Sequence, residues 1–318
     1  MSQINFITTC TNGKHSQGYP VLNLATFTAR HLPADALIHA WSQALSDAVA
    51  SGPGVPVERL YKGGHWATVM SIFDKHEINL WVLSAGLGLV KQGDRVVPYQ
   101  ATFATGQQDS IPLYATACKG KAFHQTWWRE INLRSPFAGL HPTSIAALMQ
   151  SKPDEYFILC GSPDYINATA PDIMAGIPCL SDPDKQLLII SSAQVCTDVK
   201  KYLLASSKDI AEWLNSNMLM LNARLAEYVI ARFAGSAGGH LGQAAAALRE
   251  QFAALPSASK VQGIRRTPEE VDAWLRAHLQ SVPDTSASRA LRAFRDGGNS
   301  FEEKRFRGRF AQAVARFR

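Results

Sequence analysis

Short apolar runs alternate with amphipathic stretches over the first two thirds of the chain. Four runs have the length and β-propensity of single strands: 4–10, 79–84, 156–160 and 187–191. Two segments between the first runs, 34–50 and 64–75, carry apolar residues at helical spacing. Strands that alternate with helices are typical of α/β folds. The pattern therefore predicts a three-layer α/β sandwich with a mostly parallel central sheet.

The strand signal disappears after Lys200, and helical patterns replace it. The expected helices cover 209–233, 241–255, 286–295 and 301–317. Thr267-Pro268-Glu269-Glu270 predicts one more helix start, because a threonine cap precedes a proline and a carboxylate follows three residues later. We therefore expect an α/β domain at 1–205, a helical connector at 206–254 and a helical module at 255–318.

Positive charge gathers in the last fifth of the chain. Residues 255–318 hold 13 Lys or Arg against 7 Asp or Glu, out of totals of 32 and 26, so the net charge of +6 lies entirely in this module. Clustered cations displace counterions from a phosphate backbone, and arginine offers phosphate a planar fork. The expected DNA-binding residues are Arg265, Arg266, Arg289, Arg292, Arg295, Lys304, Arg305, Arg307 and Arg309. A solvated helical face and a partner-binding module remain as alternatives.

Composition excludes several other classes of protein. Hydrophobic residues make up 46% and charged residues 18%, which is typical of a globular chain. No apolar run has the length of a membrane span, and the first residues lack the pattern of a signal peptide, so we expect a cytoplasmic protein without a membrane partner. The cysteines and histidines lack ligand spacing, and the glycines at 86 and 88 lack the third of a dinucleotide fingerprint. We therefore expect no metal, no disulfide framework and no cofactor.

Three polar loops follow the predicted strands. They cover 10–15, then 84–88 with its continuation to Tyr99, and 161–165. The carboxyl ends of neighbouring parallel strands share one edge of a sheet, so we expect the three loops to form one cleft. Plainer interpretations stay open: Asn12-Gly13 is a frequent turn pair, and Asp94-Arg95 is compatible with a surface ion pair.

The motifs in these loops resemble those of a superfamily of bacterial proteins. The matching residues are Cys10-Thr11-Asn12-Gly13-Lys14, Leu60-Tyr61-x-Gly63, Leu83-Ser84-Ala85-Gly86-x-Gly88-Leu89 and Asp94-x-x-x-Pro98-Tyr99. The superfamily includes the YaaA-type DNA-binding peroxide-stress proteins and the uracil-DNA glycosylase-like domains of archaeosine biosynthesis. The chain most resembles the prokaryotic antiviral DNA glycosylases, which excise glucosylated hydroxymethylcytosine from phage DNA.

Two loops depart from the pattern of the uracil-DNA glycosylases. Their Gly-Gln-Asp-Pro-Tyr loop after the first strand and their His-Pro-Ser loop after the last strand are both absent here. His141-Pro142-Thr143-Ser144 is superficially similar to the second loop. It precedes a predicted helix instead of ending a strand, so we do not transfer the role of that loop to it.

The resemblance implies a glycosylase-like fold and the excision of a flipped base from double-stranded phage DNA in antiviral defence. Such a reaction passes through a sugar with oxocarbenium character. The expected catalytic residues are Asp94, whose negative charge has the stabilising sign, and Asn12, which would position water. The expected substrate-binding residues are Lys14, His15, Ser84, Tyr99, Ser162 and Asp164.

Aromatic side chains and a polar segment complete the expected pocket. Tyr99, Trp127 or Trp128 would stack on the flipped base, although a Trp-Trp pair on a helix is more often part of a core. The polar segment 101–110 would line the room that a bulky modified base needs. A non-enzymatic DNA-binding stress protein and a tRNA- or nucleoside-modifying enzyme remain as alternatives. The excised base, a lyase step with Lys14 as nucleophile and the oligomeric state stay open.

Overall fold

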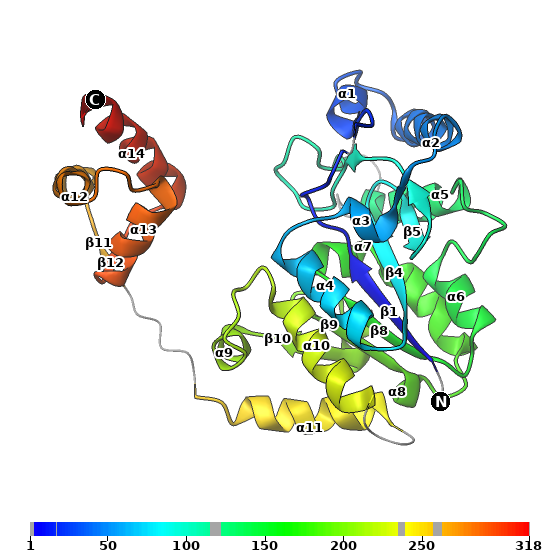
Figure 1. The fold of residues 1–318 in the computed structure, drawn as a ribbon. Coiled ribbons are helices and arrows are strands. Elements are labelled where there is room, and N and C mark those ends of the chain that lie inside the picture. The colour runs from blue at the N-terminus through cyan, green and yellow to red at the C-terminus, as the bar shows by residue number, and fades with distance from the viewer. Residues whose placement is uncertain (1–2, 17, 115–121, 235–238, 257–262, 318) are drawn as a thin grey trace. The chain divides into compact units, whose positions relative to one another are not determined.

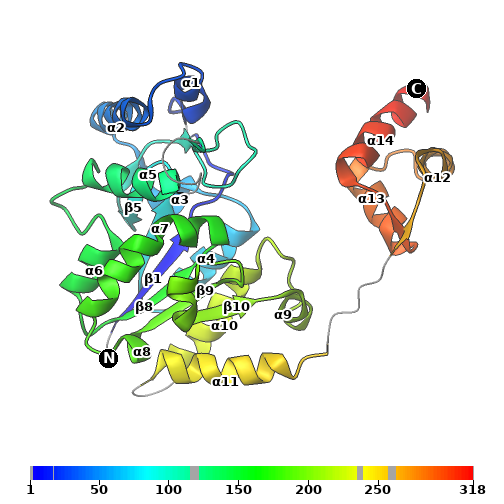
Figure 2. The ribbon, with the colours of Figure 1, turned by 180° about the vertical axis from the view of Figure 1, so that it is seen from behind.

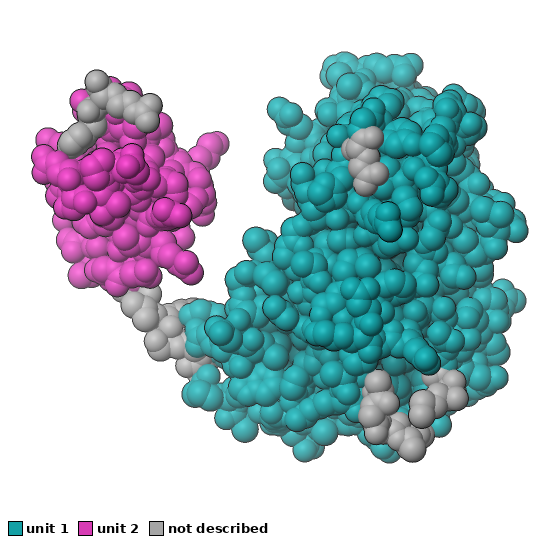
Figure 3. Space-filling model, viewed as in Figure 1, with its two compact units in different colours: residues 1–256 teal, residues 257–318 magenta. Residues whose placement is uncertain are grey.

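The chain forms two compact units, residues 1–256 and 257–318 (Figure 3). The structure is a computed structural model that describes residues 3–16, 18–114, 122–234, 239–256 and 263–317. The first unit, which we call unit 1, is an α/β unit, and the second, unit 2, is mainly helical.

Unit 1 is built on a six-stranded sheet of order β10-β9-β8-β1-β4-β5 (Figure 1). Its strands are β1 (Ile4–Thr9), β4 (Ile78–Ser84), β5 (Gly88–Lys91), β8 (Tyr156–Cys160), β9 (Leu187–Ser192) and β10 (Leu203–Ser206). β1 pairs in parallel with β4 and β8, and β9 pairs in parallel with β8 and β10. β5 runs antiparallel to β4, so the sheet is mixed.

This sheet corrects two expectations. The sequence pattern predicted a mostly parallel sheet and no strand after Lys200. The observed sheet is mixed, and it includes two further strands, β5 and β10, one at each edge. Both strands are four residues long. A strand this short owes its stability to pairing with its neighbour, and its own hydrophobic pattern is too brief to identify it.

Helices and short strands surround the sheet. The helices of unit 1 are α1 (Leu24–Thr28), α2 (Ala34–Ala50), α3 (Val57–Leu60), α4 (Gly64–Lys75), α5 (Ala122–Leu133), α6 (Ile145–Ser151), α7 (Pro163–Gly176), α8 (Pro183–Gln186), α9 (Lys208–Trp213), α10 (Leu221–Ala234) and α11 (Leu241–Ala253), with the 3-10 turns η1 (Ile177–Cys179) and η2 (Thr197–Tyr202). The short strands are β2 (Leu22–Asn23), β3 (Val55–Pro56), β6 (Arg95–Val96) and β7 (Tyr99–Gln100). In Figure 1, α4 and α10 lie in front of the sheet, and in Figure 2, seen from behind, α6 and α7 lie in front of it.

The expected connector at 206–254 packs against this sheet. α10 contacts β8 and β9, and α11 contacts β9. The single helix expected at 209–233 is broken, because Asn215 has a φ of 49° and the Asn217 side chain accepts a hydrogen bond from the backbone N–H of Met220 at 3.0 Å. These two asparagines end α9 and prepare the start of α10.

Unit 2 has its own small core. Its elements are β11 (Ile264–Arg265), α12 (Pro268–Ser281), α13 (Ala287–Asp296), β12 (Asn299–Ser300) and α14 (Glu303–Phe317). The buried core residues are Val271, Leu275, Ala290, Leu291, Phe294 and Phe306. The predicted start of α12 is confirmed: Thr267 and Glu270 exchange reciprocal hydrogen bonds between side chain and backbone.

The β4–β5 turn shows why the Leu83–Leu89 motif has its composition. The Ser84 hydroxyl accepts hydrogen bonds from the backbone N–H groups of Gly86 and Leu87 at 3.3 and 2.9 Å. Gly88 has a φ of 80°, a conformation that glycine adopts without strain. The serine and this glycine therefore shape the turn.

Two indoles and one phenol ring enclose the same turn. Trp41 donates to the Gly86 carbonyl at 2.8 Å, and Trp127 donates to the Ala85 carbonyl at 2.7 Å. A Cβ atom at Gly86 would lie 2.4 Å from Cδ2 of Tyr99. Glycine at this position is thus the condition for Tyr99 to pack on the turn.

Gly86→Ala tests this packing. The added methyl group collides with the buried Tyr99 ring, so we expect the free energy of unfolding to fall by about 1–3 kcal/mol. The measurement is urea denaturation followed by tryptophan fluorescence. Gly52→Ala is the control, since a Cβ there makes only ordinary contact with Tyr19 at 3.4 Å. Equal midpoints for the Gly86 variant and the natural chain would contradict the packing argument.

Candidate functional site

The chain changes direction across the sheet at β1. It runs from β1 to β4 and β5 on one side, and then crosses to β8, β9 and β10 on the other side. Ligands of open α/β sheets bind outside the carboxyl ends of the strands at such a switch point. The residues that follow β1 and β8 are Cys10 and Gly161, so the candidate site lies beside them. We call this end of the strands the carboxyl edge.

Three buried tyrosines meet at the carboxyl edge. The hydroxyl oxygens of Tyr61 and Tyr99 lie 3.1 Å apart, and the Ser84 hydroxyl donates to that of Tyr99 at 2.6 Å. The hydroxyl oxygen of Tyr165, in the first turn of α7, lies 3.2 Å from Sγ of Cys10. Burial raises the pKa of all three phenols well above its usual value. The three side chains are therefore neutral hydrogen-bonding groups at pH 7.

Lys14 brings an amine to this group of tyrosines. Its Nζ donates to the Thr11 carbonyl at 3.0 Å and lies 4.3 Å from the centroid of the Tyr99 ring. Burial lowers the pKa of the Lys14 ammonium, and the nearby Cys10 and Asp109 oppose this shift. Among the described residues no carboxylate forms an ion pair with Lys14. The amine is thus desolvated without a direct counter-ion.

The loop that carries Lys14 is held by the segment before α4. The Thr11 hydroxyl donates to the Lys62 carbonyl at 2.9 Å, and the backbone N–H of Lys62 donates to the Gly13 carbonyl at 3.0 Å. The backbone N–H of His15 donates to the Leu60 carbonyl at 2.8 Å. The two sequence motifs that contain these residues are therefore neighbours, and together they fix the position of the lysine.

Four of the predicted site residues present polar groups at the carboxyl edge. Asn12 and His15 are exposed in the loop after β1, and Ser162 is exposed directly after Gly161. Asp164 is half-buried in the first turn of α7. These residues follow β1 and β8, which are neighbours in the sheet. The structure thus places the first and third polar loops side by side, as the sequence predicted.

Ser84 and Tyr99 reach the same edge but are fully buried, each with 0% exposure. Their hydroxyls bond to each other, and the Tyr99 ring lies under Lys14. Neither side chain has exposed surface in the structure, so Tyr99 offers no exposed ring for the predicted stacking on a base. Both residues therefore support the site: Ser84 holds the Tyr99 hydroxyl, and the Tyr99 ring packs against Lys14.

The two neighbouring tryptophans are also buried. Trp127 bonds to the Ala85 carbonyl, and Nε1 of Trp128 donates to Asp172 at 2.8 Å. The core interpretation of this pair is therefore confirmed, and the proposed base-stacking role has no exposed ring to perform it.

Asp94 lies apart from the loops of the carboxyl edge. The antiparallel β5 leads away from that edge, since Gly88 pairs with Ser84 and Lys91 pairs with Trp81 in the middle of β4. The Asp94 carboxylate accepts from the backbone N–H of Lys91 at 2.7 Å and lies 2.8 Å from Nε2 of His141. The structure therefore does not bring the predicted catalytic aspartate to the site.

The buried pair formed by Asp94 and His141 holds two segments of the fold together. The two side chains are only 9% and 8% exposed. Burial lowers the pKa of His141, but the hydrogen bonds with Asp94 and with the Pro142 carbonyl outweigh it, and the pKa is raised overall. This pair joins the end of β5 to the segment before α6.

The polar segment 101–110, which the sequence predicted to line the pocket, brings two of its residues to the carboxyl edge. Thr102 is buried with its hydroxyl 3.4 Å from that of Tyr165, and Asp109 acts on the charge of Lys14. Sequence reasoning missed one further group. His65, in the first turn of α4, contacts the Thr8 hydroxyl through Nε2 at 3.2 Å. No motif pointed to it.

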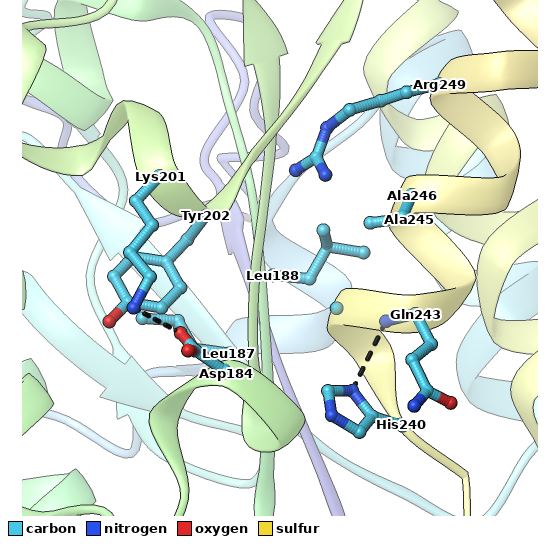
Figure 4. A pocket seen from close by; sticks show the side chains of 11 residues that line it. Asp184, Leu187, Leu188, Lys201, Tyr202, His240, Gln243, Ala245, Ala246 and Arg249 are labelled. Atoms are coloured by element: carbon cyan, nitrogen blue, oxygen red, sulfur yellow. Dashed lines mark hydrogen bonds and ion pairs between the residues drawn. The ribbon is translucent and has the colours of Figure 1, made fainter.

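A hollow lies at the opposite end of the strands. It has a volume of about 280 Å³ and is lined by residues of α8, β9 and α11 and by Lys201 and Tyr202 (Figure 4). Its charged groups already have partners: Lys201 pairs with Asp184 at 2.6 Å, and Arg249 donates to the Leu203 carbonyl at 2.9 Å. This hollow is therefore a gap between packed elements and not a candidate site.

The predicted DNA-binding residues divide into two groups within unit 2. Arg266, Arg307 and Arg309 form ion pairs with Glu270, Glu303 and Asp272. In the described part of the chain no ion pair involves the other six, which are Arg265, Arg289, Arg292, Arg295, Lys304 and Arg305, and all six are exposed.

α13 displays the exposed cations in their most regular arrangement. Arg289, Arg292 and Arg295 are spaced by three residues, while Leu291 and Phe294 point into the core of unit 2. Residues at this spacing are neighbours on a helix surface. The helix therefore separates a basic exposed face from an apolar buried face.

No cofactor or metal can be assigned from the side chains. Within the described ranges, no three His, Cys, Asp or Glu side chains are grouped so as to hold a metal ion. The four cysteines that the structure describes are free thiols, and Cys118 lies outside the described residues. No helix in the described segments has both the length and the apolar character required to cross a membrane.

The burial of His65 predicts a dependence of stability on pH. Burial lowers its pKa from 6.5 to about 4, so the unfolded chain binds a proton that the folded chain excludes between these values. The free energy of unfolding should fall on acidification through this range, by about 3 kcal/mol at most. Urea denaturation near neutral pH and at about pH 4.5 measures the loss, which His65→Gln should reduce. Equal losses in both proteins would exclude His65 as the cause.

Comparisons of the chain with models of protein families, with curated proteins and with solved structures give no match. The resemblance in its loop motifs therefore remains a prediction, and the proposals below are built on the site itself.

Proposed function

We propose that the protein is a DNA glycosylase, with unit 1 excising a modified base and unit 2 binding the DNA backbone. The observation that carries this proposal is the site at the switch point of the sheet, where Lys14 and the neutral tyrosines lie below exposed polar loops. A three-layer glycosylase-like sandwich and a place in the cytoplasm belong to the proposal. Glucosylated hydroxymethylcytosine of phage DNA is the proposed substrate.

Excision requires groups that act on the sugar and on the leaving base. The exposed Asn12 amide is suited to position water, and the carboxylates of Asp109 and Asp164 supply the negative charge that an oxocarbenium-like sugar needs. Lys14 and His15 are the donors for negative charge on the leaving base. This assignment replaces Asp94, whose carboxylate is engaged with His141.

A glucosylated base needs polar surface in its pocket. The segment 101–110 carries Asp109 to the side of Lys14, and its Thr105, Gln107 and Gln108 are exposed. Hydroxyl, amide and carboxylate groups bind sugar hydroxyls by hydrogen bonds, and a carboxylate can accept several. The composition of this segment therefore favours a base that bears a sugar over an unmodified one.

A DNA-binding protein without enzymatic activity is the second candidate. It is favoured by the burial of Ser84 and Tyr99 and by the distance of Asp94 from the carboxyl edge, since the motif residues then serve packing. The exposed arginines of α13 serve both candidates equally. Only a test of base excision separates them.

Incubation with unmodified, uracil-containing, hydroxymethylated and glucosyl-hydroxymethylated DNA tests the enzymatic proposal. Alkali reveals abasic sites, which we expect in glucosylated DNA. Asn12→Ala should lower the rate by about 100-fold, because an exposed amide that positions water acts in the transition state. Asp94→Asn is the matched control and should retain excision, since it keeps a side chain of the same shape beside His141. Intact DNA in every sample would leave the binding protein as the better account.

The role of unit 2 predicts a particular salt dependence. Arg289→Gln, Arg292→Gln and Arg295→Gln together remove three exposed cations from α13. If they contact phosphates, the slope of log affinity for duplex DNA against log salt concentration should fall by about 2 to 3. Lys75→Gln, Lys152→Gln and Lys185→Gln together remove the same charge from unit 1 and control for net charge. Equal slopes in both triple variants would contradict a binding role for α13.

A further inference from the structure

We propose that Lys14 is a nucleophile that attacks the sugar aldehyde of an abasic site and cleaves the DNA strand on its 3′ side. This proposal rests on the glycosylase function and extends it, because the first reaction would produce the abasic site that the second consumes. It assigns a lyase activity and a covalent intermediate to the same carboxyl edge.

The position of the amine is the first argument. Lys14 lies in the loop after β1, at the switch point where ligands of such sheets bind. Asn12 and His15 in the same loop are exposed, so the polar surface of the loop is open to a substrate. Nζ is therefore within the part of the molecule in which a flipped nucleotide would be held.

The surroundings of the amine are the second argument. Nζ donates a hydrogen bond to the Thr11 carbonyl at 3.0 Å, and the Tyr99 ring lies on one side of it. Among the described side chains no carboxylate forms an ion pair with Lys14, and Asp109 acts on its charge only from a greater distance. An amine has no unshared electron pair while it is an ammonium, and burial shifts this one toward the neutral, nucleophilic form.

The buried tyrosines are the third argument. Their phenols stay protonated at neutral pH and hold the site without adding negative charge. A phenolate beside Lys14 would stabilise the ammonium and remove the nucleophile. The hydroxyl of Tyr99 is instead held by Ser84 and Tyr61, with which it forms a neutral group.

The proposed reaction balances with water as its only co-reactant. The neutral amine adds to C1′ of the open-chain aldehyde, and the resulting carbinolamine loses water to give an imine. A proton leaves C2′ to solvent, the bond between C3′ and oxygen breaks, and the 3′ phosphate departs with the downstream strand. Water then hydrolyses the imine and releases the lysine together with an unsaturated aldehyde on the upstream strand.

The test supplies a preformed abasic site in duplex DNA, made from uracil by a separate glycosylase, together with sodium borohydride. Borohydride reduces the imine and leaves a stable covalent link between protein and DNA. We expect a linked species with the natural protein, and peptide mapping by mass spectrometry should locate the link at Lys14. A duplex with a tetrahydrofuran site has no aldehyde and should give no link.

Lys14→Arg keeps the charge but removes the primary amine, so the linked fraction should fall by at least about tenfold. Lys75→Arg, an exposed lysine at the end of α4, is the matched control and should link as well as the natural protein. Urea denaturation of each variant shows that it is folded. No link with the natural protein, a link mapped to another lysine, or full linking by folded Lys14→Arg would each overturn the proposal.

This experiment is independent of base excision, because the abasic site is provided. Linking at Lys14 without release of any base would mean that the glycosylase function fails and the lyase function holds. Release of a base without linking would mean the reverse. The two proposals therefore fail separately.

Discussion

The arrangement of the site depends on one buried hydrogen bond, between the hydroxyls of Ser84 and Tyr99 at 2.6 Å. The Ser84 hydroxyl donates to Tyr99, and a buried donor without an acceptor costs about 1–3 kcal/mol, so Ser84 requires the tyrosine. Ser84 also closes the β4–β5 turn, and the Tyr99 ring supports Lys14. The same bond thus links the shape of a sheet edge to the position of the lysine.

The parallel strands bring the rest of the site together. β1 lies between β4 and β8, so segments that begin at Cys10, Ala85 and Gly161 start from adjacent strands although the sequence separates them widely. Close packing keeps them near one another, since a Cβ at Gly161 would lie 2.5 Å from Cγ2 of Thr9. The sheet therefore supplies proximity, and the loops supply the chemistry.

The sequence predicted those elements that are determined by residues close together in the chain. The periodicity of α2 and α4 gave their observed bounds, and the capping residues located the start of α12. Two asparagines interrupted the helix expected at 209–233, and their turn conformation leaves no mark on the apolar period. β5 and β10 escaped prediction because each has only four residues, so its own apolar pattern is too short to identify it and pairing with the neighbouring strand stabilises it.

The candidate site was predictable to a similar extent. Loop positions followed from strand order, so Asn12, Lys14 and Asp164 were found. Asp94 was misplaced because the direction of β5 decides where it lies, and a loop was expected there. Whether Tyr99 is exposed depends on the segments that carry Lys14, Tyr61 and Ser84, which contact it from separate parts of the sequence, and no motif encodes this burial.

Desolvation connects the stability of this site to its chemistry. Removing an ammonium from water without an ion pair has a cost that the rest of unit 1 must offset. A carboxylate in an ion pair with Lys14 would reduce this cost more than the nearby Asp109 does, and would also hold the amine in its charged form. The Thr11 carbonyl and the Tyr99 ring contact Nζ without a formal charge, so they stabilise the ammonium less than a paired carboxylate would. The less stable arrangement is therefore the one suited to covalent chemistry.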